Sequence, residues 1–115
     1  AAAALIAAIF PPLSERLPVI FAGDLNTAAT DTRLDVLRGG LRDAEALAES
    51  VTHLGVIEGI DHTRRELRPA LRIDHILLSE HWAVRAFVHH APTYGAPPRR
   101  PSDHPLIVAE IAVRP

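Results

Sequence analysis

The stretch that decides the fold is PVIFAGDLNT, residues 18–27. Its apolar and partly β-branched first half predicts a buried strand over residues 18–22. Gly23 predicts the turn that ends this strand, because glycine adopts conformations that other residues resist. Asp24 and Asn26 then stand at the C-terminal end of the strand, where open α/β sheets collect their ligands. Turn chemistry is the alternative explanation, since Asp and Asn side chains cap their own backbone in loops.

Length and composition limit the class of protein. A chain of 115 residues is enough for one small domain with one core. Its formal net charge of −2 provides no broad basic surface for nucleic acid. The absence of cysteine excludes disulfides, thiolate metal sites and a cysteine nucleophile. No methionine occurs even at position 1, so we expect a piece of a longer protein.

The first ten residues are apolar and favour a helix, which the proline pair at residues 11–12 ends. Spanning a bilayer takes about 20 apolar residues, and the basic start of a signal peptide is missing. We therefore expect the end of a helix here and no transmembrane segment. A second helix is predicted after Thr30 or Asp31 as N-cap, with Leu34 and Leu37 on one face.

The glycine pair at residues 39–40 predicts the end of that second helix. Residues 41–48 then predict a short helical turn or an extended crossing, with Asp43 and Glu45 in solvent. Residues 50–69 are polar and mixed, and we expect mainly loop.

Three further strands are predicted towards the C-terminus. Residues 71–78 and 82–88 predict two strands, and the three-residue link 79–81 suits an antiparallel hairpin between them. Residues 89–101 contain several prolines and predict a loop. Residues 105–113 are almost wholly apolar and predict a central strand. The expected core residues are Ile20, Ile76, Leu77, Ile107, Val108 and Ile111.

Acidic motifs stand at or within three of these strands. Asp74 interrupts an apolar strand, and a buried carboxylate costs several kcal/mol unless it is paired. An ion pair with Arg72 or another arginine is the structural explanation for Asp74, and a turn or cap is the structural explanation for the motif SDH at residues 102–104. Because three such motifs recur in equivalent positions, one shared site is the better interpretation.

The order of the motifs resembles the C-terminal half of the endonuclease/exonuclease/phosphatase superfamily. Residues 23–26 (GDLN), 72–75 (RIDH) and 102–104 (SDH) are similar to its GD[FL]N, R[IL]D[YH] and SDH motifs. The resemblance extends over residues 18–113 but covers only about half of a family domain, so residues 1–115 are expected to be a partial domain.

This resemblance implies hydrolysis of phosphate esters with a divalent cation, Mg²⁺ or Mn²⁺. By analogy, Asp24 aligns or deprotonates the attacking water, and Asn26 hydrogen-bonds a phosphate oxygen. His104 contacts the scissile phosphate, Asp74 orients its imidazole, and Asp103 helps to bind the metal. Carboxylates suit a hard cation, and the cation offsets charge on the phosphoryl group. Which residue is the base stays open.

The fold implied by the resemblance is α+β: half of a four-layer α/β/β/α sandwich, one mostly antiparallel sheet with flanking helices. The family places its main metal-binding Glu in the N-terminal half, which we expect to be a missing partner of this chain. Glu15 lies in a connection and does not replace it. We therefore expect an exposed apolar sheet face and an inactive fragment.

The substrate stays open between nucleic acid, a lipid headgroup and a small phosphoester. His75 argues against the inositol 5-phosphatase branch, and the few basic and aromatic loop residues argue against DNA repair. The pattern is most similar to bacterial members of the family.

Two other functions compete with the enzyme. Seven histidines, with His75 and His81 at ligand-like spacing, suggest a metal-binding module. Solvated or core histidines explain them better, because no Cys pair or His-Glu-x-x-His helix accompanies them. The second rival is a degenerate, non-catalytic family member that acts as a binding scaffold; the complete set of C-terminal motifs favours the enzyme.

Overall fold

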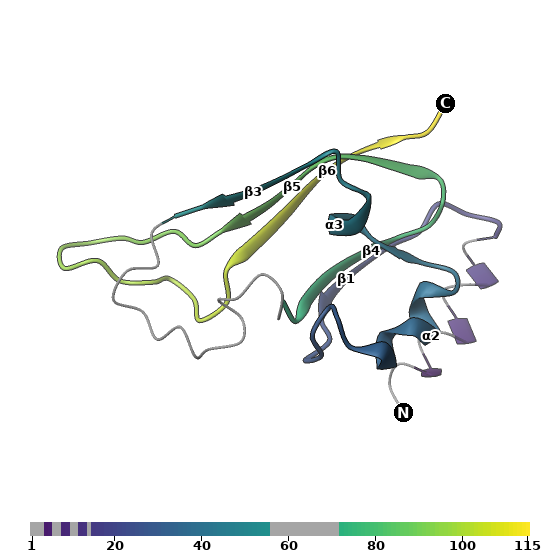
Figure 1. Cartoon of the computed structure of the whole chain (residues 1–115), viewed down its shortest axis with the longest axis horizontal. Helices are drawn as coiled ribbons and strands as arrows, with labels where there is room; N and C mark the ends of the chain where they lie inside the picture. The colour runs from purple at the N-terminus through teal and green to yellow at the C-terminus, as the bar shows by residue number, and fades with distance from the viewer. Residues whose placement is uncertain (1–3, 6–7, 10–11, 14, 56–71) are drawn as a thin grey trace.

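The computed structural model describes residues 4–5, 8–9, 12–13, 15–55 and 72–115. Strands in this part of the chain form two three-stranded sheets (Figure 1). The first sheet is antiparallel and has the order β1-β4-β2, with strands Ile20–Asp24, Asp74–Leu78 and Arg42–Asp43. The second has the order β3-β5-β6, with strands Ser50–Leu54, Trp82–His90 and Leu106–Val113. The α+β architecture is confirmed, but the expectation of one sheet is wrong.

In the second sheet, β5 pairs with β6 in antiparallel and with β3 in parallel orientation. Short helical segments connect the strands: η1 (Thr32–Leu34), α2 (Asp35–Arg38) and α3 (Ala44–Leu47). Within the described residues, no helix has the length and apolar character needed to cross a bilayer.

Strand β1 occupies the position that the opening stretch predicts, but it ends later than expected. Gly23 lies inside the strand and pairs with His75, so it does not form the turn. The turn follows at Asn26, whose φ of 50° is in the left-handed region that Asn tolerates. The Asp24 side chain accepts a hydrogen bond from the Asn26 backbone N–H at 2.7 Å. This contact caps the strand end in the way that turn chemistry predicts.

The second predicted helix is confirmed as η1 followed by α2. Asp31 is its N-cap and accepts from the Arg33 backbone N–H. Leu34 and Leu37 are both buried, which agrees with one shared apolar face. They pack with residues of the first sheet in one core cluster, Val19, Leu34, Leu37, Leu41 and Leu77. The helix ends at Arg38, with Gly39 as C-cap.

The hairpin predicted around residues 79–81 is wrong, because β4 and β5 belong to different sheets. Ser79 still follows the first sheet: its N–H donates to the Val19 carbonyl, and its hydroxyl accepts from the Val19 N–H. Trp82 then starts β5 opposite Val113 of β6. The link therefore carries the chain from one sheet to the other.

A second core cluster joins the two sheets. Leu78 of the first sheet packs with Val84 and Phe87 of the second and with Ala44 of α3, and α3 lies between the sheets in Figure 1. Of the six predicted core residues, Leu77 is buried, and Ile76, Ile107 and Ile111 are partly buried against this cluster. Ile20 and Val108 are half exposed, at 50% and 46%, so the core prediction is wrong for them.

Exposed apolar side chains gather on the outer strands. They are Ile20 on β1, Val51 and Leu54 on β3, and Leu106, Val108 and Val113 on β6. Because alternate residues of a strand point to opposite faces, Val51 and Leu54 lie on different faces of the second sheet. The expectation of one exposed apolar sheet face therefore stays a prediction.

Three other predictions need correction or lie outside the described residues. The loop predicted over residues 50–69 is wrong for its first part, which forms β3, and residues 56–69 are not described. His89 and His90 belong to β5 rather than to the following loop. The helix predicted over residues 1–10 falls mostly outside the described residues.

Candidate active site

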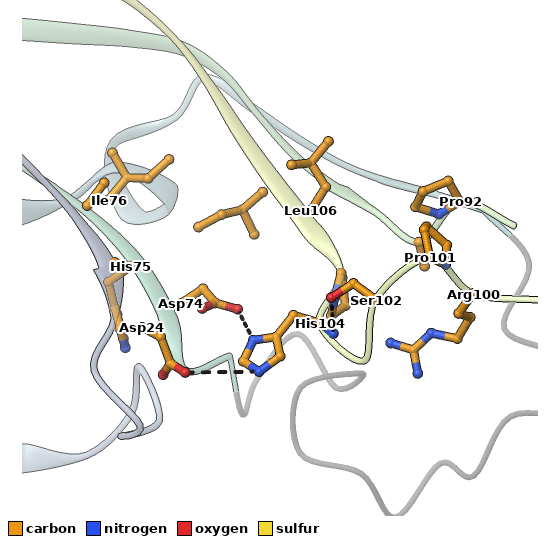
Figure 2. A pocket seen from close by; sticks show the side chains of 15 residues that line it. Asp24, Asp74, His75, Ile76, Pro92, Arg100, Pro101, Ser102, His104 and Leu106 are labelled. Atoms are coloured by element: carbon orange, nitrogen blue, oxygen red, sulfur yellow. Dashed lines mark hydrogen bonds and ion pairs between the residues drawn. The ribbon is translucent and has the colours of Figure 1, made fainter.

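Two carboxylates meet where the first sheet ends. Asp24 is the last residue of β1 and Asp74 the first of β4, and the antiparallel register makes them direct cross-strand partners. Side chains of such partners point to the same face of a sheet. The strand pairing alone therefore brings the two acids together (Figure 2).

His104 reaches these acids from the other sheet, since it lies just before β6. Its Nδ1 atom is 2.6 Å from Asp74 Oδ2, and its Nε2 atom is 4.0 Å from Asp24 Oδ2 (Figure 2). A carboxylate only accepts hydrogen bonds, so Nδ1–H donates to Asp74. The Nε2 atom is then left on the side of Asp24. The alternative explanation of Asp74 as an ion-pair partner of Arg72 is wrong, since Arg72 pairs with Asp43 and Glu45 and contacts only the Asp74 carbonyl oxygen.

The acids also change the proton affinity of His104. The hydrogen bond that His104 donates to Asp74 raises the pKa of His104 above its usual value, with smaller support from the charges of Asp74, Asp103 and Asp24. Partial burial acts in the opposite direction and is outweighed. The acids therefore favour the protonated imidazole of His104.

Asn26 and Asp103 lie outside this three-residue cluster. The ligand atoms of Asp24, Asp74 and His104 all lie within 4.8 Å of one another. Asn26 stands in the turn after Asp24 and is exposed. Asp103 is exposed beside His104 and close enough for its charge to act on the imidazole. The structure thus brings three of the five predicted site residues together and puts the other two next to them in the chain.

The cluster lies at one end of a cavity of about 650 Å³. This volume is in the range of small-molecule sites. Much of the wall is apolar and comes from both sheets and from the loop before β6: Ile76, Pro92, Pro101, Pro105, Leu106 and Ile107. The cavity can therefore receive an organic body next to the polar cluster.

The sequence matches the model of the Endonuclease/Exonuclease/phosphatase family over residues 1–104. The chain belongs to this family. The motifs that resemble the family are those that supply Asp24, Asp74 and His104. A comparison with curated proteins gave no match.

Solved structures of similar fold include three from Bacteroides. A mannosyl-6-phosphatase of Bacteroides thetaiotaomicron has a TM-score of 0.69 at 24% identity, over 96% of this chain and 44% of its own. An endonuclease/exonuclease/phosphatase family protein of the same organism has a TM-score of 0.71 at 23% identity, over 96% of this chain and 42% of its own. An endonuclease/exonuclease/phosphatase from Bacteroides vulgatus has a TM-score of 0.69 at 18% identity, over 98% of this chain and 43% of its own. These likenesses establish the fold, and the chain spans less than half of each structure.

The donor set of the cluster fits a divalent cation through its carboxylates. Hard cations such as Mg²⁺ prefer oxygen ligands, and Asp24 and Asp74 offer carboxylate oxygens on one face of the sheet. The Nδ1–H of His104 bonds to Asp74, and Nε2 lies on the side of Asp24. The histidine is thus oriented either as a hydrogen-bond or proton partner or, through Nε2, as a further ligand.

Sequence reasoning missed a buried network behind the family site. Arg72 is 3% exposed, and its Nε donates to Glu45 at 2.9 Å. The guanidinium also bonds to the Asp43 carboxylate and the Asp74 carbonyl oxygen. The expectation that Asp43 and Glu45 are in solvent is therefore wrong. The only sign of this network in the sequence is that Arg72 is opposite in charge to Asp43 and Glu45. The sequence alone does not show that these three residues pair.

The network continues into the second sheet through His89. Its Nε2 lies 2.8 Å from Glu45 Oε1. Burial tends to raise the pKa of Glu45, but the His89 hydrogen bond and the Arg72 charge outweigh it, so this pKa is lowered. Glu45 of α3 thus links Arg72, next to the site, with β5.

His75 serves the structure rather than the site. It is buried, which lowers its pKa, as does the nearby charge of Arg72. Arg72 lies 3.3 Å from Nδ1 and can only donate, so Nε2–H donates to the Thr27 carbonyl at 2.7 Å. Both ring nitrogens of His75 thus have partners within the protein.

Proposed function

We propose that this chain carries the Asp24–Asp74–His104 part of the active site of a metal-dependent phosphoester hydrolase. The observation that supports it most is the arrangement of His104, with Nδ1 bonded to Asp74 and Nε2 on the side of Asp24. A histidine held by one acid and facing another is pre-oriented for proton transfer or hydrogen bonding. Phosphoester hydrolysis is also chemistry named in the family description.

Each residue has a proposed role. Asp24 aligns or deprotonates the attacking water, and Asp74 fixes the tautomer and orientation of His104. When protonated, His104 donates from Nε2 to an oxygen of the scissile phosphate. Asn26 hydrogen-bonds a second phosphate oxygen, and Asp103 helps to hold the metal. Bound Mg²⁺ or Mn²⁺ supplies neutralisation of the phosphoryl charge.

The proposed substrate class is phosphate esters, and the similarity to a mannosyl-6-phosphatase supports a phosphatase within this class. Since each solved neighbour is more than twice as long as the matched chain, we propose that turnover needs the remainder of such a domain. The isolated 115-residue chain is then expected to show little turnover.

The test is hydrolysis of p-nitrophenyl phosphate and bis-p-nitrophenyl phosphate by the full-length gene product with Mg²⁺ or Mn²⁺. Asp24→Asn, Asp74→Asn and His104→Ala should each lower kcat/KM by about 10²–10⁴-fold. Asp35→Asn is the matched control, since Asp35 is exposed and pairs with Arg38 away from the cavity. A chelator should abolish the turnover.

The combination of Asp74→Asn with His104→Ala tests the coupling between these two residues. If Asp74 acts through His104, the double variant should lose little more than His104→Ala alone. Wild-type turnover by Asp24→Asn or His104→Ala, or turnover that persists in chelator, would contradict the proposed function.

A further inference from the structure

The cavity beside the cluster is lined by one positively charged side chain, Arg100, that has no role in the proposed function. Its charged lining residues within the described part of the chain are Asp24, Asp74, His104 and Arg100. Of these, Arg100 alone is positively charged at every physiological pH. It lies in the loop before β6, and Figure 2 shows its guanidinium directed towards the side on which His104 lies.

One nitrogen of this guanidinium is buried without a partner. Arg100 Nη2 is inaccessible to solvent and forms no hydrogen bond with the residues that the structure describes. No ion pair of Arg100 with an acid occurs among the described residues either. Buried donors are nearly always satisfied, and an unmet charged donor is the most costly kind. Nη2 is closed to solvent, so a ligand in the cavity contacts Arg100 through the part of the residue that lines the cavity.

The chemistry of the partner follows from the guanidinium. Arginine presents parallel N–H donors that match two oxygens of a phosphate. The Asp24 and Asp74 carboxylates that line the same cavity repel an anion, so a positive charge is needed to hold one there. A terminal phosphate offers three unesterified oxygens and nearly two negative charges at neutral pH. A diester offers only two such oxygens and one charge.

We propose that Arg100 is a substrate-binding residue that holds the terminal phosphate of a phosphomonoester beside His104. This inference rests on the proposed function and narrows it from phosphoesters in general to monoesters. The organic part of the substrate lies against the apolar walls formed by Ile76, Pro92 and Leu106.

The direct test is titration of the full-length protein with inorganic phosphate, free of divalent cation, followed by calorimetry or NMR. Arg100→Gln should weaken binding by about tenfold or more, the change expected for loss of a charge-assisted contact. Arg100→Lys retains the positive charge but lacks the parallel N–H donors of the guanidinium, so its phosphate affinity should lie between those of the wild type and Arg100→Gln. Arg99→Gln is the matched control, because the neighbouring Arg99 is exposed and its backbone pairs with Tyr94.

Thermal unfolding of each variant identifies any loss of folding, and Arg100→Lys carries the test if Arg100→Gln does not fold. Unchanged phosphate affinity in both Arg100 variants, or no phosphate binding by the wild type, overturns the inference. These results do not depend on turnover, so they are separate from failure of the proposed hydrolysis.

The kinetic test separates monoesters from diesters. Arg100→Gln should lower kcat/KM for p-nitrophenyl phosphate by about tenfold more than for bis-p-nitrophenyl phosphate. Equal losses on both substrates would overturn the monoester assignment while leaving hydrolysis itself intact.

Discussion

The Asp74 carboxylate and the His104 imidazole come from different sheets and meet at 2.6 Å. Asp74 starts β4 in the first sheet, and His104 precedes β6 in the second. The contact therefore depends on how the sheets pack, and it sets both the orientation and the charge of the histidine.

The first prediction concerns the pKa of His104. Asp74→Asn keeps the size of the side chain but removes its charge, so the pKa of His104 should fall towards its usual value. The measurement is the pH titration of the imidazole signals by NMR. Asp103→Asn should produce a smaller decrease, because Asp103 acts only through its charge. An unchanged titration in Asp74→Asn would contradict the proposed coupling.

The second prediction is the pH dependence of stability. The folded-state pKa of His104 is raised, so its contribution is fully present below the unfolded value of about 6.5 and is lost as pH rises through the folded pKa. The difference in unfolding free energy between wild type and His104→Gln should therefore be larger at about pH 5.5 than at about pH 8.5.

This difference must be measured against His104→Gln because His75 acts in the opposite direction. Its lowered pKa means that stability from neutral His75 is lost as pH falls. The term is common to both proteins and cancels in their difference. A difference that grows towards alkaline pH would show that the sign for His104 is wrong.

The third prediction concerns the buried Arg72 network. Arg72→Met leaves Asp43 and Glu45 without their buried partner, and we expect a loss of about 3–5 kcal/mol in unfolding free energy. Arg33→Met is the matched control, since Arg33 pairs with Asp31 at the surface, and it should change stability little. Denaturant unfolding of both variants measures the effect. Similar losses in the two would mean that burial does not determine the cost.

The fourth prediction compares two apolar side chains that sequence analysis assigned equally to the core. Leu77→Ala removes a fully buried side chain and should cost about 2–5 kcal/mol. Val108→Ala removes a half-exposed one on β6 and should cost less than about 1 kcal/mol. Chemical denaturation of the 115-residue chain is the measurement. Equal losses would show that the exposed face of β6 is covered in solution.

The motifs predicted the neighbourhood of the site because each lies at a strand end. Residue types and order were enough to predict that Asp74 lies near His104. The position of Asn26 after the strand was also anticipated, although the turn residue is Asn26 rather than Gly23. The roles of these residues stay predictions, since geometry alone does not assign them.

Other features could not be read from the sequence because their causes are tertiary. A three-residue link such as 79–81 suits a hairpin, but here Ser79 continues to bond to Val19 and directs the next strand into another sheet. Likewise, Asp43 and Glu45 have the sequence appearance of surface acids. Only the fold brings Arg72 to them.

The packing of Phe87 and Val84 against Leu78 joins the sheet that carries the acids to the sheet that carries His104. Substitutions at these apolar positions will therefore shift the separation of Asp74 and His104 without altering a polar group. In laboratory evolution for a new rate or temperature optimum, this contact between the two sheets is therefore a target in addition to the motif residues. Variants selected in such an experiment should accumulate there, at positions that do not themselves line the cavity.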